Sequence, residues 1–209
     1  MKHRSDSVLE AKQLSCIRGD NLLFEGLNFT VNAGEIHQVH GVNGAGKTSL
    51  LRLVSGLSEP ESGTISWNKA DIHEQRETYT EDLLYLWHLP GIKTELSPSQ
   101  NLKAIAVTHG ADPAVDINDV LATVGLYGYE DTPCRFLSAG QKRRVALARL
   151  YFSTAQLWLL DEPATALDVK GVATFQERLE HHAKQGGMVI LTSHQPLEFG
   201  SVKSKGIQL

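Results

Sequence analysis

The chain has 209 residues, of which 41% are apolar and 21% charged, and it carries a formal net charge of −4. A chain of this size and apolar content can bury one substantial core without disulfides or metals. Its negative charge, with no long basic run, argues against nucleic acid as a partner. No stretch approaches the roughly 18 apolar residues that cross a bilayer, and the start, MKHRSDS, lacks the apolar core of a signal peptide. We therefore expect one domain, residues 1–209, that stays in the cytoplasm.

The first third of the sequence has the pattern of strands followed by one helix. Residues 8–31 and 63–67 contain short alternating strands, interrupted by turn residues at 19–21 and 32–34, which is typical of a small antiparallel layer. Residues 35–40 also alternate like a strand, and residues 48–55 have the pattern of a helix that a glycine closes. The sequence thus predicts a strand, a glycine-rich loop and a helix in succession.

That loop, residues 41–48, reads GVNGAGKT and matches the phosphate-binding pattern G-x-x-x-x-G-K-[ST]. Small residues let the backbone N–H groups close around phosphate oxygens, and the lysine neutralises their charge. Lys47 is therefore also a candidate catalytic residue. The predicted nucleotide-binding residues of this segment are Gly41, Val42, Asn43, Gly44, Ala45, Gly46, Lys47, Thr48 and Ser49.

The pattern changes in the middle of the chain. Residues 83–128 are predicted to form helices and loops, and with the helix that begins near Ser138 they make a helical subdomain, about residues 83–150, inserted in the core. Beyond it follow an apolar strand at 157–160, a helix at 172–184 and a strand at 188–192. This alternation predicts an α/β fold with a parallel sheet.

The helix near Ser138 is preceded by a second motif, LSAGQ at residues 137–141. Ser138 and Gln141 fit the S-x-x-Q capping box of a helix N-terminus, a role that does not explain Gly140. A glycine next to a serine at a helix N-terminus leaves the amides open to an anion. Ser138, Gly140 and Gln141 are therefore candidates for capping and for binding a nucleotide phosphate, and the two roles are compatible.

Two carboxylates follow the apolar strand at 157–160. Mg²⁺ keeps several waters and needs few protein oxygens, so the Thr48 hydroxyl, Asp161 and the nucleotide phosphates are enough to hold it. Glu162 would polarise the attacking water. The structural alternative is that Asp161 and Glu162 only cap the end of a strand.

A further motif, TSH at residues 192–194, follows in order, and together the motifs resemble the nucleotide-binding domain of ABC transporters over nearly the whole chain. The resemblance implies a P-loop NTPase fold with a RecA-like parallel-sheet core, a small antiparallel β layer and a helical subdomain. It also implies a homodimer that sandwiches two ATP molecules, each held by the phosphate loop of one subunit and by Ser138 and Gly140 of the other. Residues 166–168 become a dimer-contact loop, and His194 becomes a catalytic switch residue, although a lone histidine after an apolar run is more often structural.

Within this family, residues 88–96, 101–102, 137–150 and 190–197 look like one branch, the haem-export ATPases of cytochrome c maturation. This resemblance implies membrane-embedded transporter subunits as partners and a periplasmic chaperone from which the ATPase cycle helps to release haem. It also implies a peripheral place on the cytoplasmic side of a bacterial inner membrane. Composition and periodicity by themselves indicate nothing about haem.

Two positions depart from the family pattern. Leu89 stands where the family usually offers a glutamine to the magnesium ion and the attacking water, and leucine can do neither. The loss of one hydrogen bond to a charged group costs about 1.5 to 3 kcal/mol, which predicts slower turnover, not loss of ATP binding. Where an aromatic residue commonly stacks on adenine, the sequence offers Arg18, which either stacks on the base or is solvated.

Three other functions stay open: the ATPase of another small ABC exporter, a soluble ABC protein that acts as a clamp, and a binding module that never hydrolyses ATP. A clamp usually joins two nucleotide domains or carries a long coiled coil, and this sequence has one set of motifs and no sustained heptads. Leu89 supports the binding module, whereas Glu162 and His194 argue against it.

Overall fold

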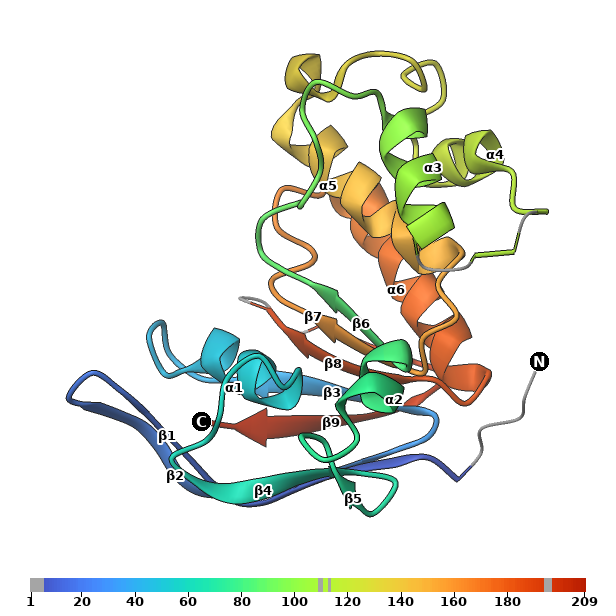
Figure 1. Ribbon diagram of the computed structural model, residues 1–209. Helices are drawn as coiled ribbons and strands as arrows, with labels where there is room; N and C mark the ends of the chain where they lie inside the picture. The colour runs from blue at the N-terminus through green and yellow to red at the C-terminus, as the bar shows by residue number, and fades with distance from the viewer. Residues whose placement is uncertain (1–5, 109–110, 113, 194–196) are drawn as a thin grey trace. The chain divides into compact units, whose positions relative to one another are not determined.

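The computed structural model describes residues 6–108, 111–112, 114–193 and 197–209 (Figure 1). It consists of two compact units. The first comprises Met1–Tyr85, Ala155–Asp161 and Leu179–Leu209, and the second comprises Leu86–Thr154 and Glu162–Arg178. None of the helices in the described residues is long and apolar enough to cross a membrane.

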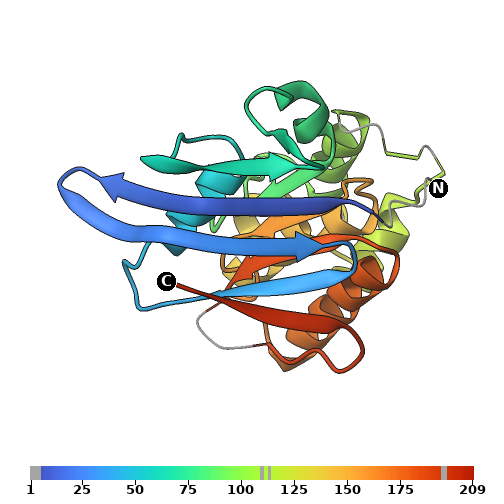
Figure 2. The same cartoon turned by 90° about the horizontal axis from the view of Figure 1, so that it is seen from below.

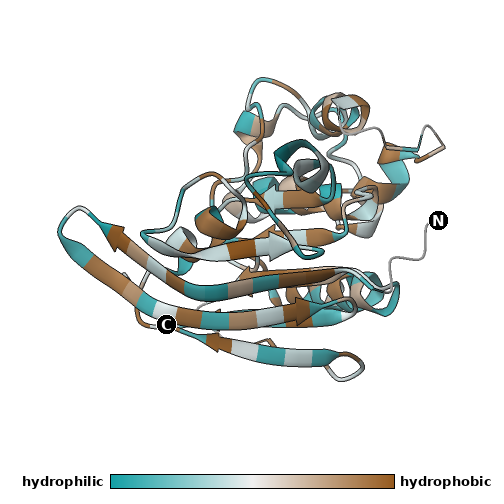
Figure 3. Ribbon diagram, turned by 60° about the horizontal axis from the view of Figure 1, so that its bottom comes forward, coloured by the Kyte–Doolittle hydropathy of each residue, from teal (hydrophilic) through white to brown (hydrophobic). Residues whose placement is uncertain are grey.

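The first unit contains a four-stranded antiparallel sheet in the order β2-β1-β4-β5. β1 and β2 form a long hairpin, and Figure 2 shows them side by side. Apolar and polar residues alternate along the strands, as the hydropathy colours in Figure 3 show, so that one face packs into the core. This sheet confirms the predicted antiparallel layer. Its strands are β1 Val8–Arg18, β2 Asn21–Asn32, β4 Ser62–Trp67 and β5 Ala70–Asp71.

The same unit contains a five-stranded sheet in the order β6-β7-β8-β3-β9. β3 pairs in parallel with both β8 and β9, and β7 pairs in parallel with β8. β7 and β8 are buried along their whole length, which is typical of parallel strands covered on both faces. The strands are β3 Glu35–His40, β6 Leu83–Leu86, β7 Leu157–Leu160, β8 Met188–Thr192 and β9 Lys203–Gln208. The predicted α/β fold with a parallel sheet is confirmed.

A single apolar core joins the two sheets through α1, Lys47–Val54, and α2, Arg76–Glu81. On the other face of the parallel sheet, Trp158 stacks on His182 of α6, Val169–Lys184, with ring centroids 3.6 Å apart. Trp67 and Trp158 are both buried, as expected for packing residues. Fully buried members of the shared core include Leu9, Val31, Leu50, Leu53, Leu157 and Ile190.

A buried ion cluster fixes the start of β3. Glu35 is 4% exposed, and its carboxylate lies 3.0 Å from Lys203 Nζ and 2.9 Å from Lys205 Nζ of the neighbouring β9. His37 Nε2 lies 3.1 Å from the same carboxylate. Burial raises the pKa of Glu35, but the hydrogen bonds from Lys205, His37 and Asn32 outweigh it and hold the pKa far below its usual range.

The second unit is helical, apart from the end of β6. Its core is formed by α3, α4 and α5 and the short helix that continues α5, around Leu102, Leu121 and Val145. The Asn101 amide is buried in this unit and donates to the Lys93 and Ser97 carbonyls at 2.9 and 3.0 Å. The elements are α3 Pro98–Thr108, α4 Ile117–Thr123, η1 Cys134–Phe136, α5 Ala139–Leu147, η2 Ala148–Tyr151 and the first part of α6.

Three elements differ from the prediction. β6 lies in the segment that was expected to contain only helices and loops, because a four-residue apolar run carries too little periodicity to distinguish strand from helix. β9 was not predicted, since only one of its residues is buried and the strand lies at the sheet edge. α2 also lies outside the predicted elements.

Candidate nucleotide site

The phosphate-binding loop connects β3 to α1 in the first unit. Gly44 and Gly46 have φ of +86° and +100°, in the left-handed region that favours glycine, and Gly46 is the residue before the first turn of α1. The first amides of a helix have no partner inside the helix and carry partial positive charge. Val42, Asn43 and Gly44 are exposed, so a phosphate can reach these amides.

Lys47 lies across this loop. Its Nζ donates to the Gly41 carbonyl at 2.7 Å and to the Val42 carbonyl at 3.3 Å. These two bonds hold the ammonium group at the loop without any ligand, so the cation is already where a phosphate would arrive.

Asp161, at the end of β7, accepts hydrogen bonds from two threonine hydroxyls. Thr48 Oγ1 donates to Oδ2 at 2.9 Å, and Thr192 Oγ1 donates to Oδ1 at 2.8 Å. Asp161 is 1% exposed. The structure thus brings together the two predicted metal ligands, Thr48 and Asp161, beside the phosphate loop. Their hydroxyl and carboxylate oxygens are the hard donors that Mg²⁺ prefers, and Mg²⁺ completes its shell with water and phosphate.

Thr192 is a residue of this network that the sequence analysis quoted in a motif but did not assign. It is fully buried at the end of β8 and holds the carboxylate of Asp161 in one orientation. The parallel pairing of β7 with β8 was the available signal, because the ends of neighbouring parallel strands meet at one edge of the sheet. The predicted His194 lies outside the described residues.

Arg18 lies at the exposed end of β1, where it pairs with Asn21 of β2. Its neighbours Ile17 and Leu22 pair across the hairpin and are 46% and 55% exposed. The hairpin end therefore offers an apolar surface beside a cation. Stacking of Arg18 on adenine stays a prediction.

The LSAGQ motif lies in the second unit, at the N-terminus of α5. Ser138 Oγ accepts from Gln141 N at 3.2 Å, and Gln141 Oε1 accepts from Ser138 N at 2.8 Å, which confirms the predicted capping box. A Cβ on Gly140 would lie 2.6 Å from the Ala166 carbonyl oxygen. Packing within the chain therefore favours a glycine at position 140, in addition to any role of Gly140 in binding a ligand. The sequence did not reveal this packing contact.

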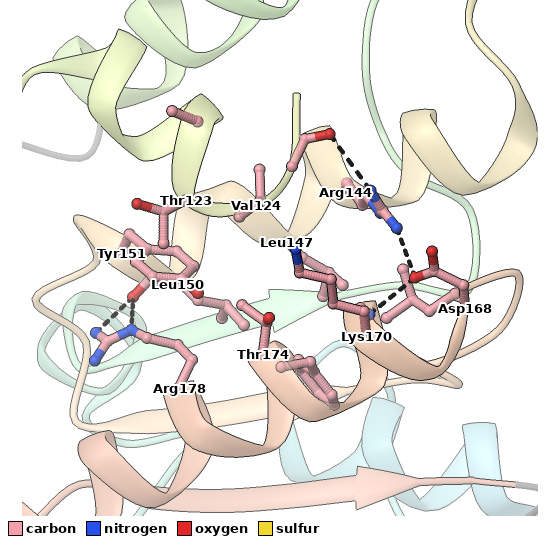
Figure 4. A pocket seen from close by; sticks show the side chains of 15 residues that line it. Thr123, Val124, Arg144, Leu147, Leu150, Tyr151, Asp168, Lys170, Thr174 and Arg178 are labelled. Carbon is pink, nitrogen blue, oxygen red and sulfur yellow. Dashed lines mark hydrogen bonds and ion pairs between the residues drawn. The ribbon is translucent and has the colours of Figure 1, made fainter. Parts of the chain in front are cut away.

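Asp168, in the predicted dimer-contact loop, is fixed by two bonds to its Oδ1. Gly171 N donates at 2.8 Å and Arg144 Nη2 at 2.6 Å. The bond from Gly171, followed by that from Arg144, lowers the pKa of Asp168. Figure 4 shows Arg144 and Asp168 at the edge of a pocket of about 300 Å³. The lining of this pocket includes none of the predicted nucleotide-binding residues.

Glu162 directly follows Asp161 in the chain and belongs to the second unit. Its φ of +50° is in the left-handed region, which a glutamate rarely adopts. Its carbonyl oxygen accepts a hydrogen bond from Arg143 Nη2 at 2.7 Å. Arg143 is a second residue that the sequence analysis missed, since it lies among several cations of α5 and nothing in the sequence distinguishes it.

Comparison with known proteins identifies the family. The sequence profile of the ABC transporter family matches residues 24–165. The cytochrome c biogenesis ATP-binding export protein CcmA of Methylococcus capsulatus is 53% identical over 196 residues, which cover 93% of this chain and 94% of that protein. The protein of the same name from Escherichia coli K12 is 49% identical over 202 residues, 97% of this chain and 96% of its own.

The solved structures agree with this result. An ABC transporter ATP-binding protein from Pyrococcus furiosus superposes with a TM-score of 0.81 at 27% identity, covering 96% of this chain and 97% of that one. This match confirms the predicted ABC nucleotide-binding fold with its RecA-like core. The chain therefore belongs to the ABC transporter family as an ATP-hydrolysing subunit, and within it to the group of cytochrome c biogenesis ATP-binding export proteins.

Proposed function

We propose that two copies of this chain bind and hydrolyse ATP at shared sites and thereby drive membrane-embedded partner subunits of the cytochrome c maturation system. The observation that carries this proposal is the contact of Thr48 with Asp161, 2.9 Å apart, beside the phosphate loop. A threonine that follows the loop lysine and a buried aspartate at a strand end are the protein ligands that a Mg²⁺–nucleotide complex requires.

The phosphate loop binds the nucleotide through its exposed amides and through Lys47. The ammonium group exchanges its bonds to the Gly41 and Val42 carbonyls for phosphate oxygens. Thr48 and Asp161 would hold Mg²⁺, which would neutralise phosphate charge. Thr192 keeps Asp161 oriented by occupying its second oxygen.

Glu162 accepts the proton of the attacking water on its carboxylate, as a general base. His194 assists at the same phosphate. Ser138, Gly140 and Gln141 act on the nucleotide of the other copy, through the amides at the N-terminus of α5 and the serine hydroxyl. Each site then needs both copies, so a monomer hydrolyses ATP poorly.

ATP hydrolysis is coupled to haem export or to the release of haem from its periplasmic chaperone, and the chain lies at the cytoplasmic side of a bacterial inner membrane. The names of the relatives that are 49% and 53% identical support a role in cytochrome c biogenesis. A c-type cytochrome receives haem during its biogenesis, and haem is therefore the cargo that we propose.

The shared-site mechanism is tested with Glu162→Gln. Without its base, this variant should accumulate as an ATP-bound dimer, measured by light scattering on a sizing column with MgATP. Lys47→Ala is the control, because it should stay monomeric for lack of bound nucleotide. A Glu162→Gln protein that remains monomeric at saturating ATP contradicts the mechanism.

The cargo is tested by affinity purification of the tagged chain from native membranes. We expect subunits of cytochrome c maturation to co-purify, with absorbance in the Soret band on the associated partners. Recovery of an unrelated permease without that absorbance would remove haem and leave the ATPase in place.

A further inference from the structure

Arg143 of α5 bridges two separate loops of the second unit. Its side chain is buried, with 4% of the residue exposed. Nε donates to the Pro163 carbonyl at 3.0 Å and Nη2 to the Glu162 carbonyl at 2.7 Å. Nη1 donates to the carbonyls of Trp87 and His88 at 2.9 and 3.1 Å. One planar guanidinium group therefore holds four backbone carbonyls, which a lysine, with a single nitrogen, cannot do.

The first of these loops carries the proposed catalytic base. Glu162 has a φ of +50°, and its own carbonyl and the next one are both held by Arg143. Because the backbone conformation sets the direction of the Cα–Cβ bond, these bonds fix the position from which the Glu162 side chain extends. A base must be within hydrogen-bond reach of the water that it deprotonates, so a small rotation at this position is enough to slow hydrolysis.

The second loop carries Leu89, in place of the glutamine that the family usually has. The residues on both sides of Leu89 are held by arginines of the α5–η2 helix: His88 by Arg143 and Gly91 by Arg149, whose Nη2 donates to the Gly91 carbonyl at 2.8 Å. Leu89 itself is 66% exposed. One link from this loop to Glu162 therefore runs through backbone carbonyls and the Arg143 guanidinium, and this link does not use the side chain at position 89.

We propose that Arg143 is a positioning residue for ATP hydrolysis, which ties residues 87–88 to residues 162–163 and so fixes Glu162 for attack on the phosphate. The proposal rests on the proposed function, in which Glu162 is the base. Arg143 acts on the rate of the chemical step and leaves nucleotide binding unchanged, because these four bonds hold residues 87–88 and 162–163 around Glu162.

The test compares kcat and KM for ATP in the full chain carrying Arg143→Met or Arg143→Lys. We expect kcat to fall at least about tenfold in both variants, with KM and nucleotide affinity within about twofold of wild type. Arg143→Lys keeps the positive charge but loses the planar set of N–H donors of the guanidinium group. If Arg143→Met does not fold, Arg143→Lys alone provides the test. An unchanged kcat, or a kcat that falls only as far as nucleotide affinity does, overturns the proposal.

Arg178→Met is the control for removing an arginine that is half-buried and binds a backbone carbonyl. Arg178 belongs to the same unit, and its Nε and Nη2 donate to the Leu150 carbonyl at 2.9 and 2.6 Å, away from both loops. We expect this variant to lower the melting temperature about as much as Arg143→Met and to keep its kcat. An equal loss of kcat in Arg178→Met would make the effect of Arg143 a general loss of stability and overturn the proposal.

A double-mutant cycle tests the positioning role of Arg143 separately from the role of Glu162 as the base. In a Glu162→Gln background, where the base is absent, Arg143→Met should change the residual single-turnover rate by less than about twofold. The same tenfold loss in both backgrounds would show that Arg143 does not act through Glu162. If Glu162→Gln alone hydrolyses ATP at the wild-type rate, the base assignment fails first, and the role of Arg143 fails with it.

Discussion

Gly140→Ala tests whether the LSAGQ motif and the loop at Ala166 must approach each other closely. The added Cβ would lie 2.6 Å from the Ala166 carbonyl oxygen, whereas carbon and carbonyl oxygen approach to about 3.3 Å. The backbone of one segment must therefore move by roughly 0.7 Å. Ala166 already has a φ of +66°, which leaves its segment little freedom to adjust.

The expected change in stability is small and the expected change in activity is large. Overpacking costs about 1 to 3 kcal/mol, but alanine in a helix is about 1 kcal/mol more favourable than glycine, so the net loss is about 0 to 2 kcal/mol. At about 2 to 4 °C per kcal/mol, the melting temperature should fall by at most about 8 °C. A displacement near 1 Å at a catalytic site can reduce the rate about a hundredfold, and we expect at least a tenfold loss of ATPase activity.

The assay measures ATPase activity at protein concentrations where the wild-type rate per subunit has reached its plateau, and thermal unfolding of the same samples. Gly200→Ala is the control, because a Cβ there meets nothing within 4 Å. Nucleotide affinity of the monomer should not change, since the phosphate loop is untouched. If Gly140→Ala keeps its ATPase rate within about twofold of wild type, ATP hydrolysis does not require the close approach of Gly140 to Ala166, and the prediction is wrong.

Three further changes test other parts of the site and fold. Thr192→Val removes the hydroxyl that donates to Asp161 at 2.8 Å, a hydrogen bond worth about 1.5 to 3 kcal/mol. The Mg²⁺ concentration that gives half-maximal ATPase activity should therefore rise roughly 10- to 100-fold. An unchanged Mg²⁺ titration contradicts the proposal that Thr192 orients Asp161. Lys47→Ala should weaken ATP binding, measured by calorimetry, by roughly 10- to 100-fold. A variant that binds ATP as tightly as wild type would rule out residues 41–48 as the phosphate-binding loop. The lowered pKa of Glu35 stabilises the fold above the unfolded pKa of about 4.3 and ceases to do so as the pH falls through the folded value. Chemical unfolding should therefore show Glu35→Gln about 1.5 to 3 kcal/mol less stable than wild type at pH 7. This difference in stability should narrow below pH 4, and a difference that stays constant with pH refutes the role of the ion cluster.

The strands and motifs that the sequence predicted are those with local signals. The strand at 35–40, the loop that follows it and the capping box at Ser138 each depend on neighbouring residues, and the structure contains them at the expected positions. β9 has no such signal: its residues are mostly polar and exposed, and it forms because its lysines meet the Glu35 carboxylate across the sheet. Strands of this kind depend on a partner that is distant in sequence.

The residues of the candidate site also include some with a local sequence signal and some without one. Lys47, Thr48 and Asp161 belong to motifs, whereas Thr192 reaches Asp161 over 31 positions of the sequence. Arg143 reaches Trp87 over 56 positions. Topology brings these residues to the motif residues that they orient. Thr192 belongs to the TSH motif, but its contact with Asp161 depends on the pairing of β7 with β8, and the sequence around Arg143 does not indicate its role.

We expect the departure at Leu89 to have a limited effect on hydrolysis because of such residues. If the glutamine of the family were the only support of its loop, leucine would both remove a hydrogen bond and release the backbone. Here Arg143 and Arg149 hold the carbonyls of His88 and Gly91, on either side of Leu89, so the backbone stays in place without it. The cost is then limited to the missing side-chain bond, about 1.5 to 3 kcal/mol. We expect that amount to slow turnover and to leave binding at Lys47 and the phosphate loop intact.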